Sequence, residues 1–426
     1  MARQLTYSAM AALSFAVPQA VHGQTFGSGM SVDIAPTLDR GDVAGSRAEP
    51  TLQPLSHRVG PVLVRPAFGL VSGYEDNVLY APDARGDAIL VVAPRLDLVL
   101  DDPRHDLALT VAGTARRFAR MESQNSEEFL IQSANRLDVA PDLEVRLGAD
   151  LSRRVEPRNS AGTILDALEP VSYDRLGAET SLTLAIGTLD LTMGGAVERV
   201  TYNPLTLRAG GEDDQSFRDL RTIGGNVRLG YDLSGFMTAF AEVHASTHHS
   251  LHPIEGRARD SRGLNMVAGL KGAVSALVSL EVALGYQLRD YREDIYRDFS
   301  GASFVIKGEW YPTPFVTAQF GLSRHFRNSG NRNVAAILED GLSASLFYDP
   351  TRQLRFALTG DVQHDRYRDT TTRAWRKQVT FKVNYQINRA VALGAQIHWL
   401  DQTVSGAPLV NAFKGFGGGV GITVTP

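Results

Sequence analysis

Side chains that could do chemistry are sparse in this sequence, and they lack the spacing that a reactive site needs. His364, His398 and Ser345 are residue types that a serine hydrolase uses, but no motif fixes their geometry relative to one another. The chain contains no cysteine, which excludes thiol catalysis, thiolate zinc sites and a disulfide framework. We therefore predict that the chain is not an enzyme.

Metal-binding residue types are equally scattered. His248, His249 and His252 fall within a predicted loop, where they could take up a metal adventitiously, yet no second set of ligands accompanies them. The acidic pairs at 213–214 and 293–294 resemble solvated loop tips more than a calcium site. We expect no metal and no cofactor.

Charged side chains instead recur at every second position of otherwise apolar runs. In residues 143–151, for example, Leu, Val, Leu, Ala and Leu alternate with Glu, Arg, Gly and Asp. Successive side chains of a strand point to opposite faces, so one face is apolar and the other carries the ionised groups. A helix would mix both kinds on every face. The same alternation recurs at 226–233, 280–289, 304–310, 354–362 and 378–387.

The connections between these strands separate a membrane barrel from a soluble sandwich. Very short turns near 141–142, 187–188, 234–235, 275–276, 312–314, 349–352 and 388–389 alternate with long polar loops near 75–87, 157–170, 203–216, 247–260, 328–333 and 366–373. Membrane barrels show this alternation of short periplasmic turns and long extracellular loops. We predict an all-β fold, a closed antiparallel transmembrane β-barrel of about 18 strands with 16 as the alternative, running from 64–73 to 416–424.

Composition and the amino terminus agree with export to the outer membrane of a Gram-negative bacterium. Only 43% of the 426 residues are apolar and the net charge is −4, which gives no footprint for nucleic acid. Arg3 precedes an apolar stretch at 5–17, so we expect a signal peptide at 1–23 that is cleaved after Gly23, with Ala20 as the alternative. We expect residues 24–61 to form a flexible periplasmic segment, with a segment folded back into the pore as the alternative, and residues 62–426 to form the barrel.

The inner face of such a barrel is where function would lie. Seventeen charged residues are candidates to line the lumen: Asp97, Arg116, Arg136, Glu144, Arg146, Asp150, Arg228, Asp232, Lys271, Glu281, Arg289, Lys307, Glu309, Arg355, Asp361, Arg376 and Lys382. Both signs are mixed, so we expect many of them to pair across neighbouring strands. Aromatic residues near strand ends predict interfacial girdles: Tyr74, Tyr80, Phe118, Trp310, Tyr311, Tyr348, Trp375 and Trp399.

A motif at the end of the first strand carries a family resemblance. Gly73, Tyr74, Glu75, Asp76 and Asn77 are followed by a polar loop and by a strand at 88–100 with a central proline. This opening resembles the outer-membrane β-barrel porins encoded beside exopolysaccharide and capsule export genes. The remainder, to residue 426, matches that family in length, layout and strand pattern.

The resemblance implies a conduit through which an exopolysaccharide or capsular polysaccharide crosses the outer membrane. It also implies two partners: outer-membrane lipid around the barrel, and a periplasmic polysaccharide export protein that lacks its own outer-membrane pore. The residues themselves indicate only a wide, polar, mixed-charge lumen, which fits a general diffusion porin for small hydrophilic solutes as well. No loop with opposed charge clusters, of the kind that constricts a diffusion porin, is evident in the sequence.

Overall fold

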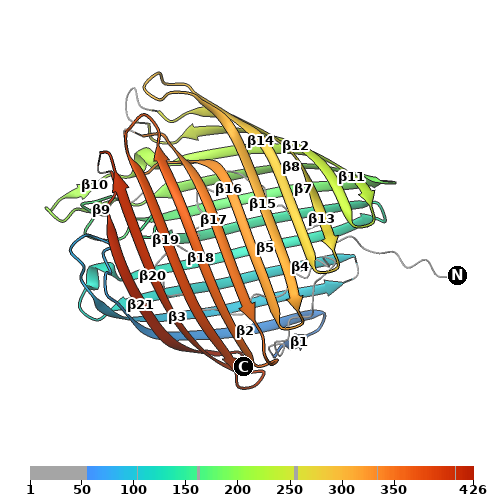
Figure 1. Ribbon diagram of the computed structural model, residues 1–426, viewed down its shortest axis with the longest axis horizontal. Helices are drawn as coiled ribbons and strands as arrows, with labels where there is room; N and C mark the ends of the chain where they lie inside the picture. The colour runs from blue at the N-terminus through green and yellow to red at the C-terminus, as the bar shows by residue number, and fades with distance from the viewer. Residues whose placement is uncertain (1–54, 103, 161–163, 254–257, 333, 408) are drawn as a thin grey trace.

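Long antiparallel strands make up nearly all of the computed structural model, which describes residues 55–426 except 103, 161–163, 254–257, 333 and 408 (Figure 1). Eighteen of the strands in this part of the chain form the wall. They are β2 (Val62–Glu75), β3 (Asp87–Asp102), β4 (His105–Phe118), β5 (Ser126–Ala140), β6 (Leu143–Val155), β7 (Ser172–Ile186), β8 (Leu189–Tyr202), β11 (Leu220–Ser234), β12 (Met237–Ser250), β13 (Ser261–Ser275), β14 (Val278–Tyr291), β15 (Phe299–Thr313), β16 (Val316–Asn328), β17 (Ala336–Tyr348), β18 (Leu354–Tyr367), β19 (Arg373–Gln386), β20 (Val391–Ser405) and β21 (Phe413–Val424).

The wall closes on itself. Each wall strand pairs antiparallel with the strands before and after it, and β2 pairs with β21 from Phe68 opposite Val424 to Glu75 opposite Gly417. Closure leaves no sheet edge, so the backbone groups of every wall strand have partners on both sides, as a hydrocarbon environment requires. The predicted closed antiparallel barrel of about 18 strands is confirmed.

Three further strands and two short helical turns complete the described structure. β1 (His57–Val59) extends the sheet beside β2, while β9 (Leu205–Thr206) and β10 (Glu212–Asp213) form a small hairpin in one loop. The turns are η1 (Glu122–Gln124) and η2 (Ser216–Arg218). Among the described residues, none lies in a helix long and apolar enough to cross a membrane.

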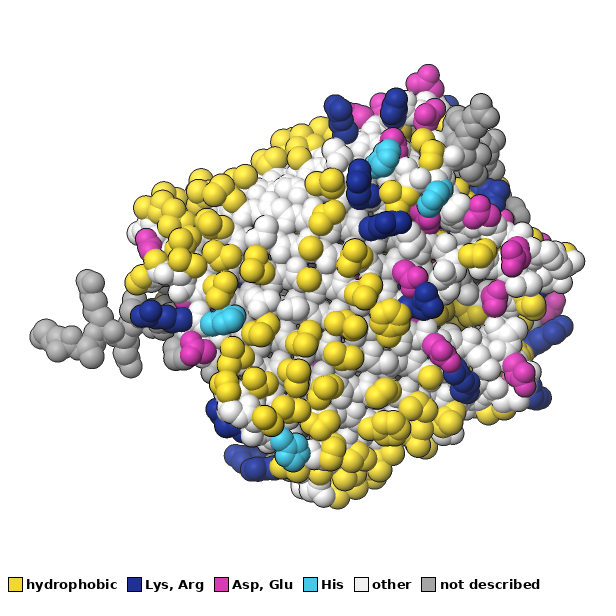
Figure 2. All heavy atoms as spheres, turned by 180° about the vertical axis from the view of Figure 1, so that it is seen from behind, with side chains coloured by type: hydrophobic (Ala, Val, Ile, Leu, Met, Phe, Trp, Pro, Cys, Tyr) yellow, Lys and Arg dark blue, Asp and Glu magenta, His cyan; other side chains and the backbone are white. Residues whose placement is uncertain are grey.

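The two faces of the wall differ in chemistry as the alternation predicts. In β14, Leu284 is 61% exposed and Tyr286 is 44% exposed, whereas Arg289 on the other face is buried. Figure 2 shows the outer surface on the side opposite to Figure 1: hydrophobic side chains cover the wall, and charged side chains gather toward the end that carries the long loops. A large exposed apolar belt is unfavourable in water but matches the hydrocarbon core of a bilayer.

Short and long connections alternate around the ring. Turns such as those joining β5 to β6 and β7 to β8 contain two residues, whereas the loops joining β6 to β7 and β8 to β11 are many times longer. Loops between β4 and β5, between β14 and β15 and between β20 and β21 belong to the long set, although the sequence did not single them out. All long loops lie at one end, which is the extracellular end of a bacterial barrel.

The aromatic girdle was predicted only in part. Tyr74, Trp310, Tyr348, Trp375 and Trp399 are exposed on the outer wall. Tyr80 is buried in a loop against Leu400 and Phe413, Phe118 packs inside against Ile89, and the Tyr311 hydroxyl donates to Glu309 on the inner wall. Adjacent strand residues face opposite sides, so Trp310 and Tyr311 could not both face lipid.

The amino-terminal predictions fall mostly beyond the described chain. The signal peptide at 1–23 and most of the segment at 24–61 lie outside the described residues. Within the described part of that segment, β1 pairs with β2, and the His57 imidazole is 2.9 Å from the Pro426 carbonyl oxygen. These residues therefore continue the sheet at the end of the barrel that carries the short turns.

Candidate functional site

The inner wall holds all seventeen charged residues singled out from the sequence. Each occupies a strand position on the face opposite to the exposed apolar residues; Arg228, for example, is buried between Val227 and Leu229, which are about half exposed. Their side chains therefore face the interior of the barrel.

Most of these inner charges form ion pairs with carboxylates on the same or a neighbouring strand. The pairs within 4 Å are Arg95–Asp97 (2.8 Å), Arg116–Glu128 (2.5 Å), Arg136–Asp106 (2.7 Å), Arg146–Glu144 (2.5 Å), Arg228–Glu242 (3.6 Å), Arg355–Asp349 (2.7 Å), Arg175 with Asp150 and Glu198, and Arg376–Asp365. Pairing of this kind cancels charge locally, so the wall carries little field of a single sign.

The remaining candidates have uncharged hydrogen-bond partners, lie beside an opposite charge on the next strand, or face the interior singly. Arg289 donates to the Asn328 side chain at 2.7 Å and contacts His248 at the same distance. Lys271, Glu281 and Lys307 lie directly opposite one another on β13, β14 and β15, which makes a row of alternating sign. Asp232, Glu309, Asp361 and Lys382 also face the interior, from β11, β15, β18 and β19.

Several charged residues of the inner wall were missed from the sequence. Arg175, Glu242 and Arg327 all lie inside the barrel but were not among the candidates. Glu242 pairs with Arg228 because the two are directly opposite on β12 and β11. Alternation identifies the face of each residue, but only the strand register identifies its partner.

A denser charged network lies toward the extracellular end, on β16 to β19. Arg327 contacts Glu339 at 2.8 Å and Asp365 at 3.6 Å, and Asp365 also pairs with Arg376. Glu339, Asp365 and Arg376 are all buried. Buried charges persist only when they are paired, so this network rigidifies one side of the lumen.

A second charged contact joins the loop between β8 and β11 to the end of β6. The Arg218 guanidinium, in η2, donates to both carboxylate oxygens of Glu156, just beyond the end of β6, at 3.0 Å each. It also lies 3.9 Å from the centroid of the Tyr202 ring. Burial lowers the pKa of Arg218, but the Glu156 carboxylate raises it, and the net pKa lies above its ordinary value.

The loop between β8 and β11 carries Arg218 into contact with Glu156, a contact that the sequence did not reveal. Glu156 is 62 residues from Arg218, so local patterning could not reveal the contact. The same loop also meets the loop between β16 and β17, so charged groups bridge two loops at the extracellular end.

Two further arginines join the long loops over the mouth. Arg259, 8% exposed, donates to the Ser329 carbonyl at 2.5 Å and to the Asn331 carbonyl, and its guanidinium lies over the Phe217 ring. Burial lowers the pKa of Arg259 below its ordinary value. Arg332 pairs with Asp213 at 2.6 Å. We call Arg218, Glu156, Arg259 and Arg332 the mouth cluster.

The motif at the end of β2 has a structural role at the closing seam. The Glu75 carboxylate is 2.9 Å from the His398 imidazole on β20, and Asp76 accepts from the Phe416 backbone at 2.7 Å on β21. Asn77, 2% exposed, donates to the carbonyls of Ala81 and Lys414, each at 2.8 Å. Three consecutive polar residues therefore join the first strand to the last two.

The residues weighed for catalysis do not converge. His364 stacks on Trp375 on the outer wall, with ring centroids 4.2 Å apart, whereas His398 lies inside with Glu75. Ser345 contacts the Thr359 hydroxyl at 3.2 Å. No nucleophile–base pair is formed by these side chains.

The three clustered histidines also separate. His248 and His249 belong to β12, not to the predicted loop, because the strand continues to Ser250. His248 faces inward, His249 outward toward Asp260, and His252 contacts Asp219 at 2.9 Å. Within the described ranges, no group of three or more His, Asp or Glu side chains is placed to hold a metal.

Comparison with known proteins gives one family and a set of distant barrels. A protein-family model described as "Putative beta-barrel porin 2" matches residues 49–422. No curated protein sequence matches the chain.

Three solved structures illustrate the similarity in fold. OccAB2 of Acinetobacter baumannii is 14% identical, with 85% of this chain and 98% of that chain covered and a TM-score of 0.45. The outer membrane protein OpdK of Pseudomonas aeruginosa is 12% identical over 85% and 99%, with a TM-score of 0.44. The ferric enterobactin receptor PfeA of Pseudomonas aeruginosa, in a mutant form, is 9% identical over 88% and 81%, with a TM-score of 0.44.

Proposed function

Because this chain belongs to the putative β-barrel porin 2 family, we propose that its pore carries an exported polysaccharide across the outer membrane. The family and the closed barrel place the chain in the outer membrane of a Gram-negative bacterium. The cargo in this proposal is an exopolysaccharide or capsular polysaccharide, which leaves the cell through the lumen.

The observation that carries the proposal is the pairing of charges on the inner wall. Arg146 with Glu144, Arg116 with Glu128 and their counterparts leave a polar surface with hydrogen-bonding groups but little net charge of one sign. A long hydrated glycan offers many weak hydrogen bonds, and a wall with a strong field of one sign would retain a charged polymer. The resemblance of residues 73–77 to porins of exopolysaccharide and capsule clusters supports the same cargo.

A polymer must reach the pore from the periplasm. The resemblance implies a periplasmic polysaccharide export protein as the partner that delivers it. We propose that this partner docks at the barrel end with the short turns, where β1 and the carboxy terminus lie together. A diffusion porin needs no partner at that end, so binding of a periplasmic export protein there would distinguish an export pore from a diffusion porin.

The alternative is a general diffusion porin for small hydrophilic solutes. The mouth cluster favours it, because the Arg332–Asp213 pair ties the loop between β16 and β17 to the loop between β8 and β11 over the extracellular end. Export through the same barrel requires those loops to separate when the polymer passes. A diffusion porin would work with the mouth cluster in place.

Reconstituted vesicles can separate these functions. Vesicles that contain the protein would be loaded with linear neutral glucans of increasing length, and release would be followed with and without Arg332→Gln. The export proposal predicts that long glucans escape once the mouth cluster is weakened, and that small anions and cations pass about equally well. Release limited to short sugars in both proteins would contradict export and favour the diffusion porin.

A further inference from the structure

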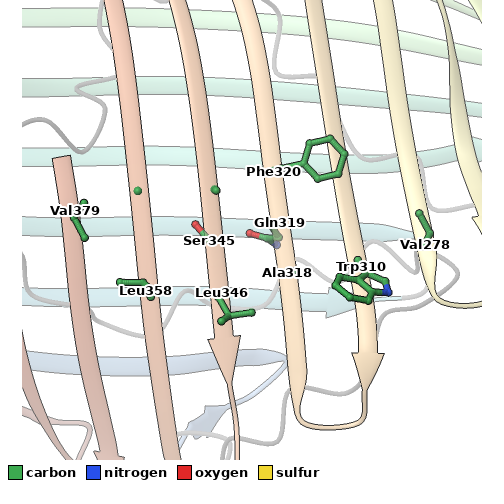
Figure 3. A pocket seen from close by; sticks show the side chains of 11 residues that line it. Val278, Trp310, Ala318, Gln319, Phe320, Ser345, Leu346, Leu358 and Val379 are labelled. Atoms are coloured by element: carbon green, nitrogen blue, oxygen red, sulfur yellow. The ribbon is translucent and has the colours of Figure 1, made fainter. Parts of the chain in front are cut away.

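The outer wall has a hollow within its lipid-facing belt. It measures about 780 Å³ and crosses β14 to β19 (Figure 3). Its floor is formed by small outward-facing residues, Ala318, Ala344 and Gly360, while Trp310 and Leu358 stand at its sides. A side chain at Gly360 would meet nothing within 4 Å, so the floor is open space and not a packed contact. We call this feature the outer groove.

Charged residues face outward on the same strands, toward the extracellular end. Arg324 on β16 and Arg366 on β18 both bind Asp340 on β17, at 2.5 Å and 2.7 Å. Arg373 on β19 lies directly opposite Arg366. We call these three arginines and Asp340 the outer basic cluster.

The outer basic cluster carries an excess of positive charge. The cluster contains three guanidinium groups but one carboxylate, and that carboxylate is bound by Arg324 and Arg366 only. Like charges directly opposite on neighbouring strands destabilise a sheet unless an anion lies between them. Within the described structure the guanidinium of Arg373, an exposed residue, makes no hydrogen bond or ion pair. The cluster is therefore complementary to a ligand that brings at least one more negative charge.

The outer groove and the outer basic cluster are aligned. Each groove residue lies four to six positions from a charged residue of the same strand, which is roughly 13–20 Å along the strand. The pairs are Ala318 and Arg324 on β16, Ala344 and Asp340 on β17, and Gly360 and Arg366 on β18. Tilted strands reduce that separation along the membrane normal to about half of a hydrocarbon core. The basic cluster thus lies at the level of the outer-leaflet headgroups when the groove lies among the acyl chains.

We propose that this combined surface binds a phosphate-bearing lipid of the outer leaflet. The lipid phosphate would lie between Arg366 and Arg373, with Arg324 on its other side, and one acyl chain would occupy the outer groove over Ala344 and Gly360. Planar guanidinium groups bind phosphate oxygens in pairs, which suits two opposed arginines. A second copy of this chain fits poorly, because it would bring its own positive cluster to the same level.

The site can be tested on the purified, folded barrel in detergent. Diphosphoryl lipid A is added, and bound lipid is measured by native mass spectrometry and by titration. The phosphate contacts are tested with Arg366→Gln plus Arg373→Gln, and the groove with Gly360→Leu. We expect the double arginine variant to bind lipid A about 25-fold more weakly, because each arginine contributes about fivefold. We expect Gly360→Leu to bind lipid A about tenfold more weakly, because its side chain fills the groove.

Matched controls exist on the other side of the ring. Arg199 and Arg221 are a second outward-facing pair, directly opposite on β8 and β11, which do not line the outer groove. Gly195 faces outward on β8, and a side chain there would meet only a backbone oxygen at 3.8 Å. Replacing the pair by glutamine, or Gly195 by leucine, should leave lipid A binding unchanged. Heat-modifiable gel migration checks that each variant is folded.

Several outcomes would overturn the proposal. Equal binding of dephosphorylated lipid A would remove the role of the arginines, and full competition by inorganic phosphate would reduce the site to an anion contact without a lipid. Dimers of the barrel that Gly360→Leu dissociates would show that a second copy occupies the groove. Loss of binding in the control variants as large as in the test variants would show that any basic pair suffices.

Discussion

A charge placed on the outer wall should cost far more than the same charge placed on the inner wall. Leu284 lies at the middle of β14, is 61% exposed and faces the centre of the apolar belt. Arginine at the membrane midplane of a barrel costs about 2–4 kcal/mol. We therefore expect Leu284→Arg to lower the free energy of unfolding by about 2–4 kcal/mol, measured by urea titration of the barrel in lipid vesicles.

The control lies on the same strand. Gln287 is three residues from Leu284 and faces the interior, where water and neighbouring polar groups solvate a guanidinium; Gln287→Arg should change stability by less than about 1 kcal/mol. Gly285 faces the interior too, but its added side chain would lie 2.4 Å from the Met266 carbonyl oxygen, so it is a poor control. Equal tolerance of Leu284→Arg and Gln287→Arg would refute the assignment of faces, because a slip of one residue exchanges them.

Three other results follow from the same structure. Asn77→Ala removes the two hydrogen bonds that Asn77 donates to the carbonyls of Ala81 and Lys414 at the closing seam. We expect the free energy of unfolding to fall by about 2–4 kcal/mol and the thermal transition to shift to a lower temperature. An unchanged transition would show that the seam does not depend on the motif. Arg332→Gln removes the ion pair with Asp213 and should raise single-channel conductance, whereas unchanged conductance would mean that the mouth cluster does not limit flow. The mature protein should fractionate with outer membranes and migrate heat-modifiably, and a soluble periplasmic protein would contradict the barrel.

The architecture was accessible from sequence because its signal is local. A period of two in residues 280–289 states which side chains share a face without reference to any other strand. The first wall strand, predicted at 64–73, spans Val62–Glu75, and the last, predicted at 416–424, spans Phe413–Val424. Strand ends were the least accurate feature, since the alternation fades where polar residues occupy both faces.

Contacts that depend on register or on loops were not accessible. Arg228 could be assigned to the inner face, but its partner Glu242 follows only from the pairing of β11 with β12. Arg218 and Glu156 meet through the loop between β8 and β11. The outer groove depends on Ala318 and Gly360, which are on different strands and are ordinary small residues when viewed singly.

The most direct test of the proposed function compares surface polymer and solute uptake in the same cells. The gene would be deleted and then restored, and exopolysaccharide on the cell surface would be quantified together with the uptake rate of a small hydrophilic nutrient. Export predicts that the deletion removes the surface polysaccharide and leaves nutrient uptake unchanged, and that restoring the gene returns the polymer. Normal surface polysaccharide combined with slower nutrient uptake would contradict export and identify a diffusion porin.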